Sequence, residues 1–492
     1  MIPTMKTLLS MSLAGALAGC SLAPTYQRPD APVDTLYPSG PAYGVAAQQP
    51  AGQVAAADVG WREFFHDPLL QRIIALALAN NRDMRVAALN VEAARAQYRI
   101  QRADLLPSLG VAGDTTVQRS PGDLTQTGRP EISRQYRVGG AISSWELDLF
   151  GRIQSLSEQA LQTYLAQDET RIATQLALIA ETAQAYLTLR ADQELLQLTK
   201  DTLSSQENSY KLTKQSYDQG VGTALDLSQA EISLRTAQRN QSQYLRQVAQ
   251  DRNALTLLAG QPLPADVLAQ LDESKSLPDD IVIADLPAGL PSDLLSRRPD
   301  VRAAEHVLRG ANANIGAARA AFFPSISLTG MAGTASASLG GLFKAGSGAW
   351  SFAPQISLPI FAGGSLMADL DLAHVRKRIE VANYEKAIQT GFREVADGLA
   401  GRATLDDQIA AQRLLVDASQ RAYTLSDQRF RQGVADYLSV LDSQRSLYTA
   451  QQALVDTRLS RLTNLITLYK SLGGGWTEHT VSADAATTAS SQ

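Results

Sequence analysis

The chain has 492 residues, of which 44 are Lys or Arg and 49 are Asp or Glu, so its formal net charge is −5 at pH 7. This near balance gives no electrostatic basis for binding nucleic acid. A single cysteine and four widely spaced histidines provide neither a disulfide framework nor metal-ligand spacing, and no enzyme motif for phosphate binding or nucleophilic attack is found.

The first residues have the layout of a secretory signal peptide, in which a basic start at Met1 or Met5 precedes an apolar run. The run ends in "LAGC", which resembles a bacterial lipobox with Cys20 as the acylated residue. We therefore expect cleavage of residues 1–19 and a covalent lipid on Cys20, with no other cofactor. The serine that follows is not the aspartate of inner-membrane lipoproteins, so this resemblance implies the outer membrane. The alternative is an ordinary signal peptide with an incidental cysteine.

The segment that follows, residues 20–60, is rich in Ala, Pro and Gly and is interpreted as a lipidated tether. Beyond it the chain repeats itself. The stretch beginning at Asn81 matches the stretch beginning at Arg298 without a gap, and two later segment pairs match at nearly equal offsets. These matches predict a tandem duplication, with repeats at 61–280 and 281–476 and a polar, disordered tail at 477–492.

Very long helices are predicted in each repeat, because glycine and proline are absent or sparse over long stretches. These stretches are residues 152–219, 223–259, 365–432 and 434–472. A helix of 68 residues would extend roughly 100 Å, far beyond any compact core. Apolar residues recur every seven positions from Leu189 to Tyr217, which is typical of helices packed side by side in a coiled coil.

The breaks between these helices contain Gly220 in the first repeat and Gly433 in the second. A glycine at a helix end allows the chain to turn back into a following helix. Each repeat is therefore predicted to contain a long helical hairpin with its tip near the glycine. Plain helix termination, without any role in binding, is the alternative for both glycines.

Alternating apolar and polar residues predict two strands in each repeat, at about 108–118, 135–149, 325–338 and 349–361. The strands fit either an open sheet on a soluble core or part of a membrane barrel. Eleven residues tilted by ~40° span the ~25 Å apolar band of an outer-membrane barrel. Four strands cannot close a barrel in lipid, so two or three chains would have to share one.

Several long motifs resemble the OprM-like lipoprotein subgroup of the TolC-like outer-membrane efflux channel family. They include "YQRPDAPV", "GWREFF", "WELDLFGR", "GAARAAFFPSISLTG" and "YLSVLDSQRSLYTAQQ", and the similarity runs from Cys20 to about Trp476. It implies a mainly α chain with a membrane β-barrel part, assembled as a homotrimer with a 12-stranded barrel and a 12-helix periplasmic tunnel. The trimer would be the passive exit duct of a multidrug efflux pump, working with a periplasmic adaptor and an inner-membrane RND transporter.

The resemblance also implies a gate at the periplasmic tip. Leu438 and Asp442 lie four residues apart, hence on one helix face, and three copies would form an apolar constriction and a ring of aspartates that favours cations. Asp226 of the first repeat is a further candidate. Gly220 and Gly433 mark the tips expected to dock the adaptor. In the alternative interpretation Asp442 is a solvated residue and Leu438 a core contact.

Some family members lock the tip with a tyrosine bonded to an arginine and carry a second aspartate one turn from the first. This chain departs from them, because the matching positions are Phe430, Ala435 and Ser439. Two other functions fit a chain of this kind. One is the exit duct of another exporter, such as a type I secretion system. The other is a structural periplasmic lipoprotein, which the alternating strands disfavour.

Overall fold

The structure is a computed structural model that describes residues 21–43, 55–273, 276–284, 286–287, 289 and 291–480. The predicted signal peptide and Cys20 lie outside the described residues. The chain divides into two compact units, each assembled from three segments. Of the described residues, the first unit draws on 21–30, 90–167 and 303–384, and the second draws on those within 31–89, 168–302 and 385–480. Each unit draws on both repeats, so the predicted boundary at 280 separates two copies of a sequence and not two compact bodies.

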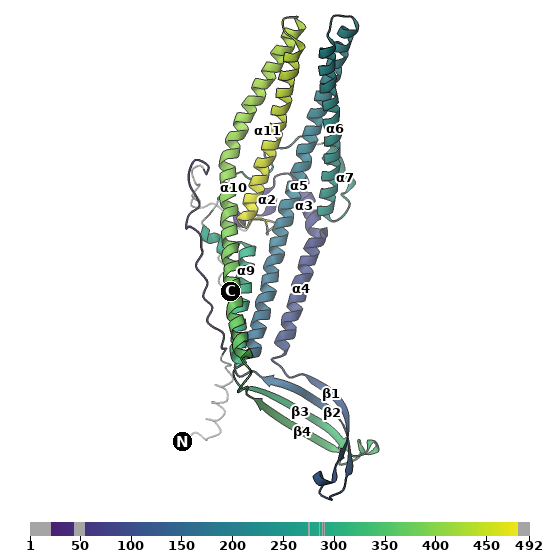
Figure 1. Ribbon diagram of the computed structural model, residues 1–492, viewed down its shortest axis with the longest axis vertical. Coiled ribbons are helices and arrows are strands. Elements are labelled where there is room, and N and C mark those ends of the chain that lie inside the picture. Colours follow the sequence, from purple (N-terminus) through teal and green to yellow (C-terminus); the bar gives the residue numbers. More distant parts are fainter. Residues whose placement is uncertain are drawn as a thin grey trace. The chain divides into compact units, whose positions relative to one another are not determined.

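The same series of elements occurs twice along the chain (Figure 1). The first copy contains α4 (Arg82–Ala103), β1 (Leu109–Ser120), β2 (Glu131–Leu147), α5 (Arg152–Asp218) and α6 (Ala224–Ala259). The second contains α9 (Pro299–Ala320), β3 (Ser325–Ser336), β4 (Gly348–Ser357), α10 (Ser365–Arg431) and α11 (Tyr437–Ser471). Both α4 and α9 have 22 residues, and both α5 and α10 have 67, so the two copies match element by element. No described helix combines the length and the hydropathy required of a transmembrane helix.

The main apolar core lies in the second unit. Short elements pack there against the long helices: α2 (Trp61–Phe64), α3 (Pro68–Asn80), α7 (Ala265–Glu273) and α8 (Leu294–Arg297). Phe64 is fully buried and stacks on Tyr469 with ring centroids 3.8 Å apart. Asp67 caps α3 by accepting from the backbone of Leu69, and it also accepts from the hydroxyl of buried Tyr186 at 2.6 Å. Each large side chain buried here contributes roughly 1.5–3 kcal/mol. The α3 helix is thereby fixed against α5.

The coiled-coil seam predicted from the seven-residue spacing is present in α5. Leu189, Leu196 and Leu203 are buried, with exposed fractions of 0, 8 and 9%. Towards the tip the seam opens, and Tyr217 is 43% exposed. The single chain therefore leaves apolar surface uncovered near its helical tips.

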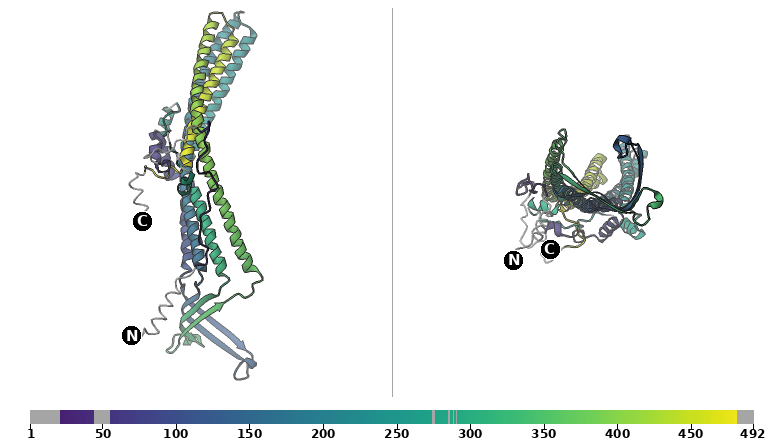
Figure 2. Two further views of the ribbon diagram at one scale, coloured as in Figure 1. Left: turned by 90° about the vertical axis from the view of Figure 1, so that its left-hand side faces the viewer. Right: turned by 90° about the horizontal axis from the view of Figure 1, so that it is seen from below.

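The four strands form one antiparallel sheet in the order β1-β2-β3-β4, and the sheet is curved (Figure 2). Two predicted boundaries were wrong. The β2 strand begins at Glu131 and not near 135, because its pairing with β1 continues as far as Ser120. The β4 strand ends at Ser357 and not near 361, since Pro359 has no N–H to donate to a strand ladder.

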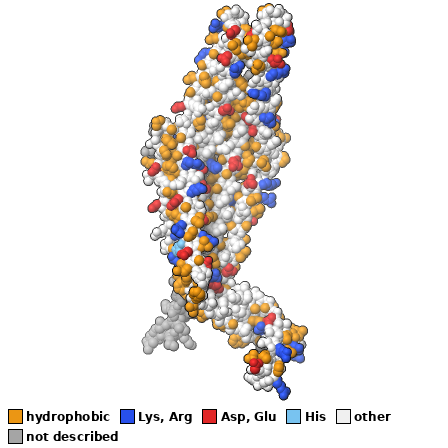
Figure 3. All heavy atoms as spheres, viewed as in Figure 1, with side chains coloured by type: hydrophobic (Ala, Val, Ile, Leu, Met, Phe, Trp, Pro, Cys, Tyr) orange, Lys and Arg blue, Asp and Glu red, His pale blue; other side chains and the backbone are white. Residues whose placement is uncertain are grey.

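The two faces of the sheet differ in polarity. Partners that lie opposite each other in register project to the same side. One face therefore carries apolar residues in rows such as Val111 beside Gly140, and Leu109 beside Ile142. The other face carries small and polar residues, including the ion pair between Asp114 and Arg137 at 2.9 Å. Space-filling Figure 3 shows both apolar and charged side chains on the strand region.

The prediction of a disordered tail from residue 477 was wrong for its first four residues. The carbonyls of Thr477 and Glu478 accept from the backbone N–H groups of Trp61 and Arg62 at 3.1 and 3.2 Å. The side chain of His479 lies 2.9 Å from a carboxylate oxygen of Glu63. The first N–H groups of a helix have no partner within it, and the tail supplies partners for the start of α2. Residues 481–492 lie outside the described residues.

The predicted N-terminal tether is extended in backbone but fastened to the first unit. Arg28 pairs with Glu305 on α9 at 2.8 Å, and the Glu305 side chain is only 6% exposed. The amide of Asn312 donates to the carbonyl of Pro24 at 2.7 Å. Burial by itself raises the pKa of Glu305, but the hydrogen bonds from Arg28 and Arg309 leave it below its ordinary value. The segment after Cys20, the residue predicted to carry a lipid, is therefore a bound strap and not a free linker.

Candidate channel gate at the helical tips

Both long hairpins turn through the same backbone motif. At the end of α5, Gly220 donates to the carbonyl of Tyr217 at 2.9 Å and Val221 donates to that of Ser216 at 3.0 Å. The φ angle of Gly220 is 76°, in the left-handed region that side chains disfavour. This pair of bonds is a Schellman motif, which satisfies carbonyls at the helix end.

At the end of α10, Gly433 donates to Phe430 and Val434 to Arg429, both at 2.9 Å. The φ angle of Gly433 is 71°, and no atom lies within 4 Å of where a Cβ would stand. Backbone conformation, and not lack of space, therefore requires glycine at this position. The following valine is displayed to solvent at each tip, since Val221 is 83% and Val434 66% exposed.

A side-chain cap begins each returning helix. In the first repeat the capping residue carries a hydroxyl and its partner a carboxylate, and in the second repeat the capping residue carries the carboxylate and its partner the hydroxyl. Before α6, Thr223 and Asp226 form a reciprocal capping box, with the hydroxyl donating to the carboxylate at 2.6 Å. Before α11, Asp436 caps the helix and accepts from the backbone and the hydroxyl of Ser439. Those bonds lower the pKa of Asp436, the hydroxyl contributing most. The carboxylate of Asp226 is thus engaged in capping α6.

The gate candidates Leu438 and Asp442 lie in the first turns of α11, outside the buried face of that helix. The buried face of this helix packs against the first hairpin, where Tyr437, Val440 and Leu441 surround Ala230 of α6. Leu438 is 51% exposed and Asp442 is exposed. Within the described residues of the single chain, Asp442 forms no ion pair. An apolar side chain and a carboxylate are therefore presented together, outside the core.

Sequence reasoning missed Arg445, which continues this exposed stripe. It lies three residues after Asp442, and both side chains are exposed. The spacing of three places them on one face of α11, and this spacing alone could have identified it. The stripe thus has an apolar residue nearest the tip, then an acidic residue, then a basic one.

Farther from the tips, polar contacts join α11 to α5. Gln206 donates to Gln444 at 2.9 Å in a buried position. Arg458, only 15% exposed, pairs with Glu194 at 2.9 Å. Buried polar groups require partners, so these contacts hold the second hairpin in one register against the first.

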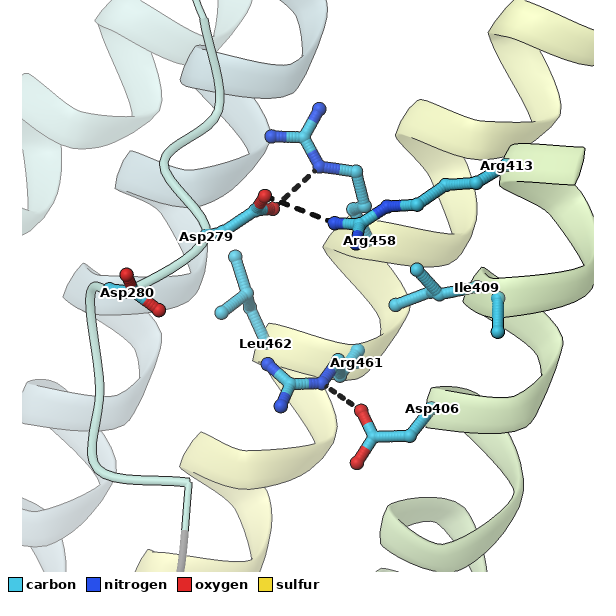
Figure 4. A pocket seen from close by; sticks show the side chains of 9 residues that line it. Asp279, Asp280, Asp406, Ile409, Arg413, Arg458, Arg461 and Leu462 are labelled. Atoms are coloured by element: carbon cyan, nitrogen blue, oxygen red, sulfur yellow. Dashed lines mark hydrogen bonds and ion pairs between the residues drawn. The ribbon is translucent and has the colours of Figure 1, made fainter. Parts of the chain in front are cut away.

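A cavity of about 380 Å³ lies beside this junction, lined by residues of α10, α11 and the segment before α8 (Figure 4). Asp279 accepts from Arg458 at 2.8 Å and from Arg413 at 3.2 Å, and Arg461 pairs with Asp406. Figure 4 shows the guanidinium groups turned towards these carboxylates. Because each drawn arginine has an acidic partner, the cavity walls are ion pairs that fasten the segment to α10 and α11.

A cluster of three aspartates lies where α5, α6 and α11 meet. The carboxylates of Asp192 and Asp251 are within hydrogen-bonding reach, and Asp456 is near enough to act on Asp192. Burial, the bond to Asp251 and the neighbouring charges raise the pKa of Asp192 to about 7. Burial also raises the pKa of Asp251 and of Asp456. Two carboxylates within hydrogen-bonding reach of each other share a proton more readily than both remain charged.

The family described as "Outer membrane efflux protein" matches this chain over residues 73–261 and 290–474. The chain belongs to this family. The "Probable efflux pump outer membrane protein TtgC" of Pseudomonas putida KT2440 is 54% identical to it over 480 residues, which cover 97% of this chain and 98% of that protein. "Outer membrane protein OprJ" of Pseudomonas aeruginosa PAO1 is 45% identical over 469 residues, covering 95% and 96%.

Solved structures of related proteins are also similar in fold to this chain. A crystal structure of a membrane protein from Pseudomonas aeruginosa has a TM-score of 0.85 at 45% identity and covers 93% of this chain and 98% of its own. The open state of the Neisseria gonorrhoeae MtrE outer membrane channel has a TM-score of 0.82 at 39% identity, with coverage of 94% and 100%.

Membership confirms the expected fold class, with strands for a barrel and long helices for a tunnel, and the expected outer-membrane location. The chain is an outer-membrane efflux channel. Channels of this family are trimeric and work with an adaptor and an inner-membrane transporter, and the matched relatives are channels and not enzymes. Among the described residues, no three His, Cys, Asp or Glu side chains are grouped so that they could hold a metal ion.

Proposed function

We propose that three copies of this chain form the exit duct of a tripartite RND-type multidrug efflux pump. The observation that carries the proposal is the four-stranded sheet, because it has one apolar face and two unpaired edges, at β1 and β4. Lipid offers no partner for an open edge. Joining β1 of one copy to β4 of the next satisfies both edges, and three copies give twelve strands.

The duct conducts solutes passively from the periplasm to the exterior. Relatives are described as antibiotic and toluene efflux proteins, which supports small, largely apolar cargo. The chain does no chemistry in this proposal, and the only covalent group is a lipid on Cys20. The strap from Ser21 to Asp30 would hold that lipid beside the first unit through Arg28 and Glu305.

Closure is assigned to Leu438 and Asp442 at the periplasmic end. Their exposure outside the buried face of α11 supports this assignment. In a three-fold assembly, the leucines would narrow the path and the carboxylates would repel one another unless cations or protons compensated. The tips at Gly220 and Gly433, with exposed Val221 beside the first, are assigned to docking of the adaptor.

The test is single-channel conductance of the purified protein in a planar bilayer. We expect small, cation-preferring currents from the wild type, and larger currents with weaker preference from Leu438→Ala/Asp442→Ala. A matched control is Leu225→Ala, since Leu225 is 65% exposed at the equivalent position of the first hairpin. Equal currents from wild type and gate variant would refute the gate. No current from protein shown to be inserted would refute the channel.

A further inference from the structure

The apolar face of the sheet ends in two arginines at the β1–β2 hairpin. Register pairs Val117 with Arg134, and Arg119 with Ile132. All four residues therefore project from the same face as Val111. Both arginines are exposed, and neither forms an ion pair within the described part of the chain. Two unpaired cations thus stand in adjacent rows at one end of an otherwise apolar surface.

The length of that surface places the arginines relative to the membrane. On this face, β3 runs from Ile326, opposite Leu147, to Ser336, opposite Tyr136. Ten residues at ~3.4 Å each, tilted by ~40°, rise about 26 Å, which matches the apolar band of an outer-membrane barrel. Each further row adds about 5 Å, so Arg134 lies roughly 5 Å and Arg119 roughly 10 Å beyond the band.

This end of the sheet is the one remote from the helices, because α4 enters at the other end of β1 and α5 leaves from the other end of β2. With the helices in the periplasm, the two arginines lie at the outer leaflet. The sheet supplies them with no acid on their own face. Asp114 and Glu131 belong to the opposite face, where Asp114 pairs with Arg137, and Asp123 lies in the connecting loop.

We propose that Arg119 and Arg134 form a binding site for a phosphorylated glycolipid of the outer leaflet, the lipid A part of lipopolysaccharide. Acyl chains pack on the apolar rows of β1 and β2, and the phosphate lies between the two guanidinium groups. Arginine suits this contact because its planar fork donates two hydrogen bonds to phosphate oxygens. Tyr136, in the row just below, is the kind of residue found at the membrane interface.

The ligand of the two arginines is a lipid and not free phosphate. Two exposed arginines alone bind a free anion weakly in water. An acyl chain held on the adjoining apolar face brings its own headgroup to the site at high local concentration. The inference requires only that this face meets lipid, and it is independent of the proposed gate and pump partners.

The experiment measures lipid A binding to the purified, full-length trimer in detergent by native mass spectrometry. Probes are bisphosphorylated lipid A, dephosphorylated lipid A and inorganic phosphate. We expect Arg119→Gln/Arg134→Gln to weaken binding of bisphosphorylated lipid A about tenfold or more. A matched control is Arg137→Gln, which removes an arginine from the opposite face of β2 and should leave binding within about twofold.

A second variant distinguishes loss of the binding site from misfolding of the protein. Arg119→Lys/Arg134→Lys keeps both charges and should retain most of the binding, while wild type should bind dephosphorylated lipid A about tenfold more weakly. Equal binding of the phosphorylated lipid by wild type and the glutamine variant would overturn the proposal. So would equal binding of both lipid forms, or displacement of the lipid by millimolar phosphate, which would indicate a site for free anions.

Discussion

Protonation of the aspartate cluster should control the stability of the helical hairpins, and Asp192→Asn tests this directly. The cluster joins three helices, and burial together with Asp251 raises the pKa of Asp192 to about 7 from an ordinary 3.8. Between about pH 4 and 7 the folded protein therefore keeps a proton that the unfolded chain has released. Stability is highest below this window, falls as pH rises through it and is constant above it.

The magnitude follows from the size of the pKa shift. About three pKa units at ~1.4 kcal/mol each give a ceiling of ~4 kcal/mol per chain. Water reaches this half-buried cluster and screens it, so we expect roughly 1–2 kcal/mol. The pKa values of Glu305 and Asp436 are lowered from their ordinary values of 4.5 and 3.8. These two acids therefore change protonation state below the range from pH 5 to 8. Burial also raises the pKa of Glu169, outside the cluster. The difference between wild type and Asp192→Asn across that range therefore reports on the cluster.

The assay is thermal unfolding of the detergent-solubilised trimer between pH 5 and 8, followed by tryptophan fluorescence. The wild type should melt at progressively lower temperature as pH rises, whereas Asp192→Asn should change less and exceed the wild type at pH 8. Asp201→Asn, an exposed position on the same helix, serves as the control and should follow the wild type. A wild-type melting temperature that rises across this range would refute the reasoning.

Three further predictions concern the tips and the strap. Gly433→Pro should abolish drug resistance in cells, because proline can neither adopt the 71° φ angle nor donate the N–H hydrogen bond of this turn. An immunoblot should still detect the trimer in the membrane. Normal resistance in this variant would exclude a role of the tip in docking the adaptor. Asp226→Ala should lower the free energy of unfolding by ~1 kcal/mol, the cost of losing a helix cap, and so lower the melting temperature without changing the conductance; a larger conductance would assign Asp226 to the gate. Arg28→Ala should destabilise the trimer by ~1–3 kcal/mol, because it removes a partner from the buried carboxylate of Glu305. Arg72→Ala removes a partner from an exposed ion pair and should cost under ~1 kcal/mol. Equal losses in melting temperature for the two variants would contradict this prediction.

Much of the fold was predictable because its signals are local or repeated. The absence of glycine and proline marked α5 to within a residue, and Gly220 marked its end. Strand interiors followed from alternation, but the start of β2 was misplaced because pairing with β1 extends a strand beyond its apolar pattern. The ordered start of the tail had no local signal, since its bonds are to α2, more than four hundred residues away.

The sequence by itself determined the helices, the strands, the duplication and the positions of the tip glycines, because these depend on backbone preferences and on periodicity within a few turns. Only the tertiary structure decided which side of α11 carries Leu438 and Asp442 to the surface, and that Asp192 and Asp251 share one site. The physical reason is that burial, ion pairing and pKa depend on distances between residues remote in sequence. Such distances exist only once the helices have packed.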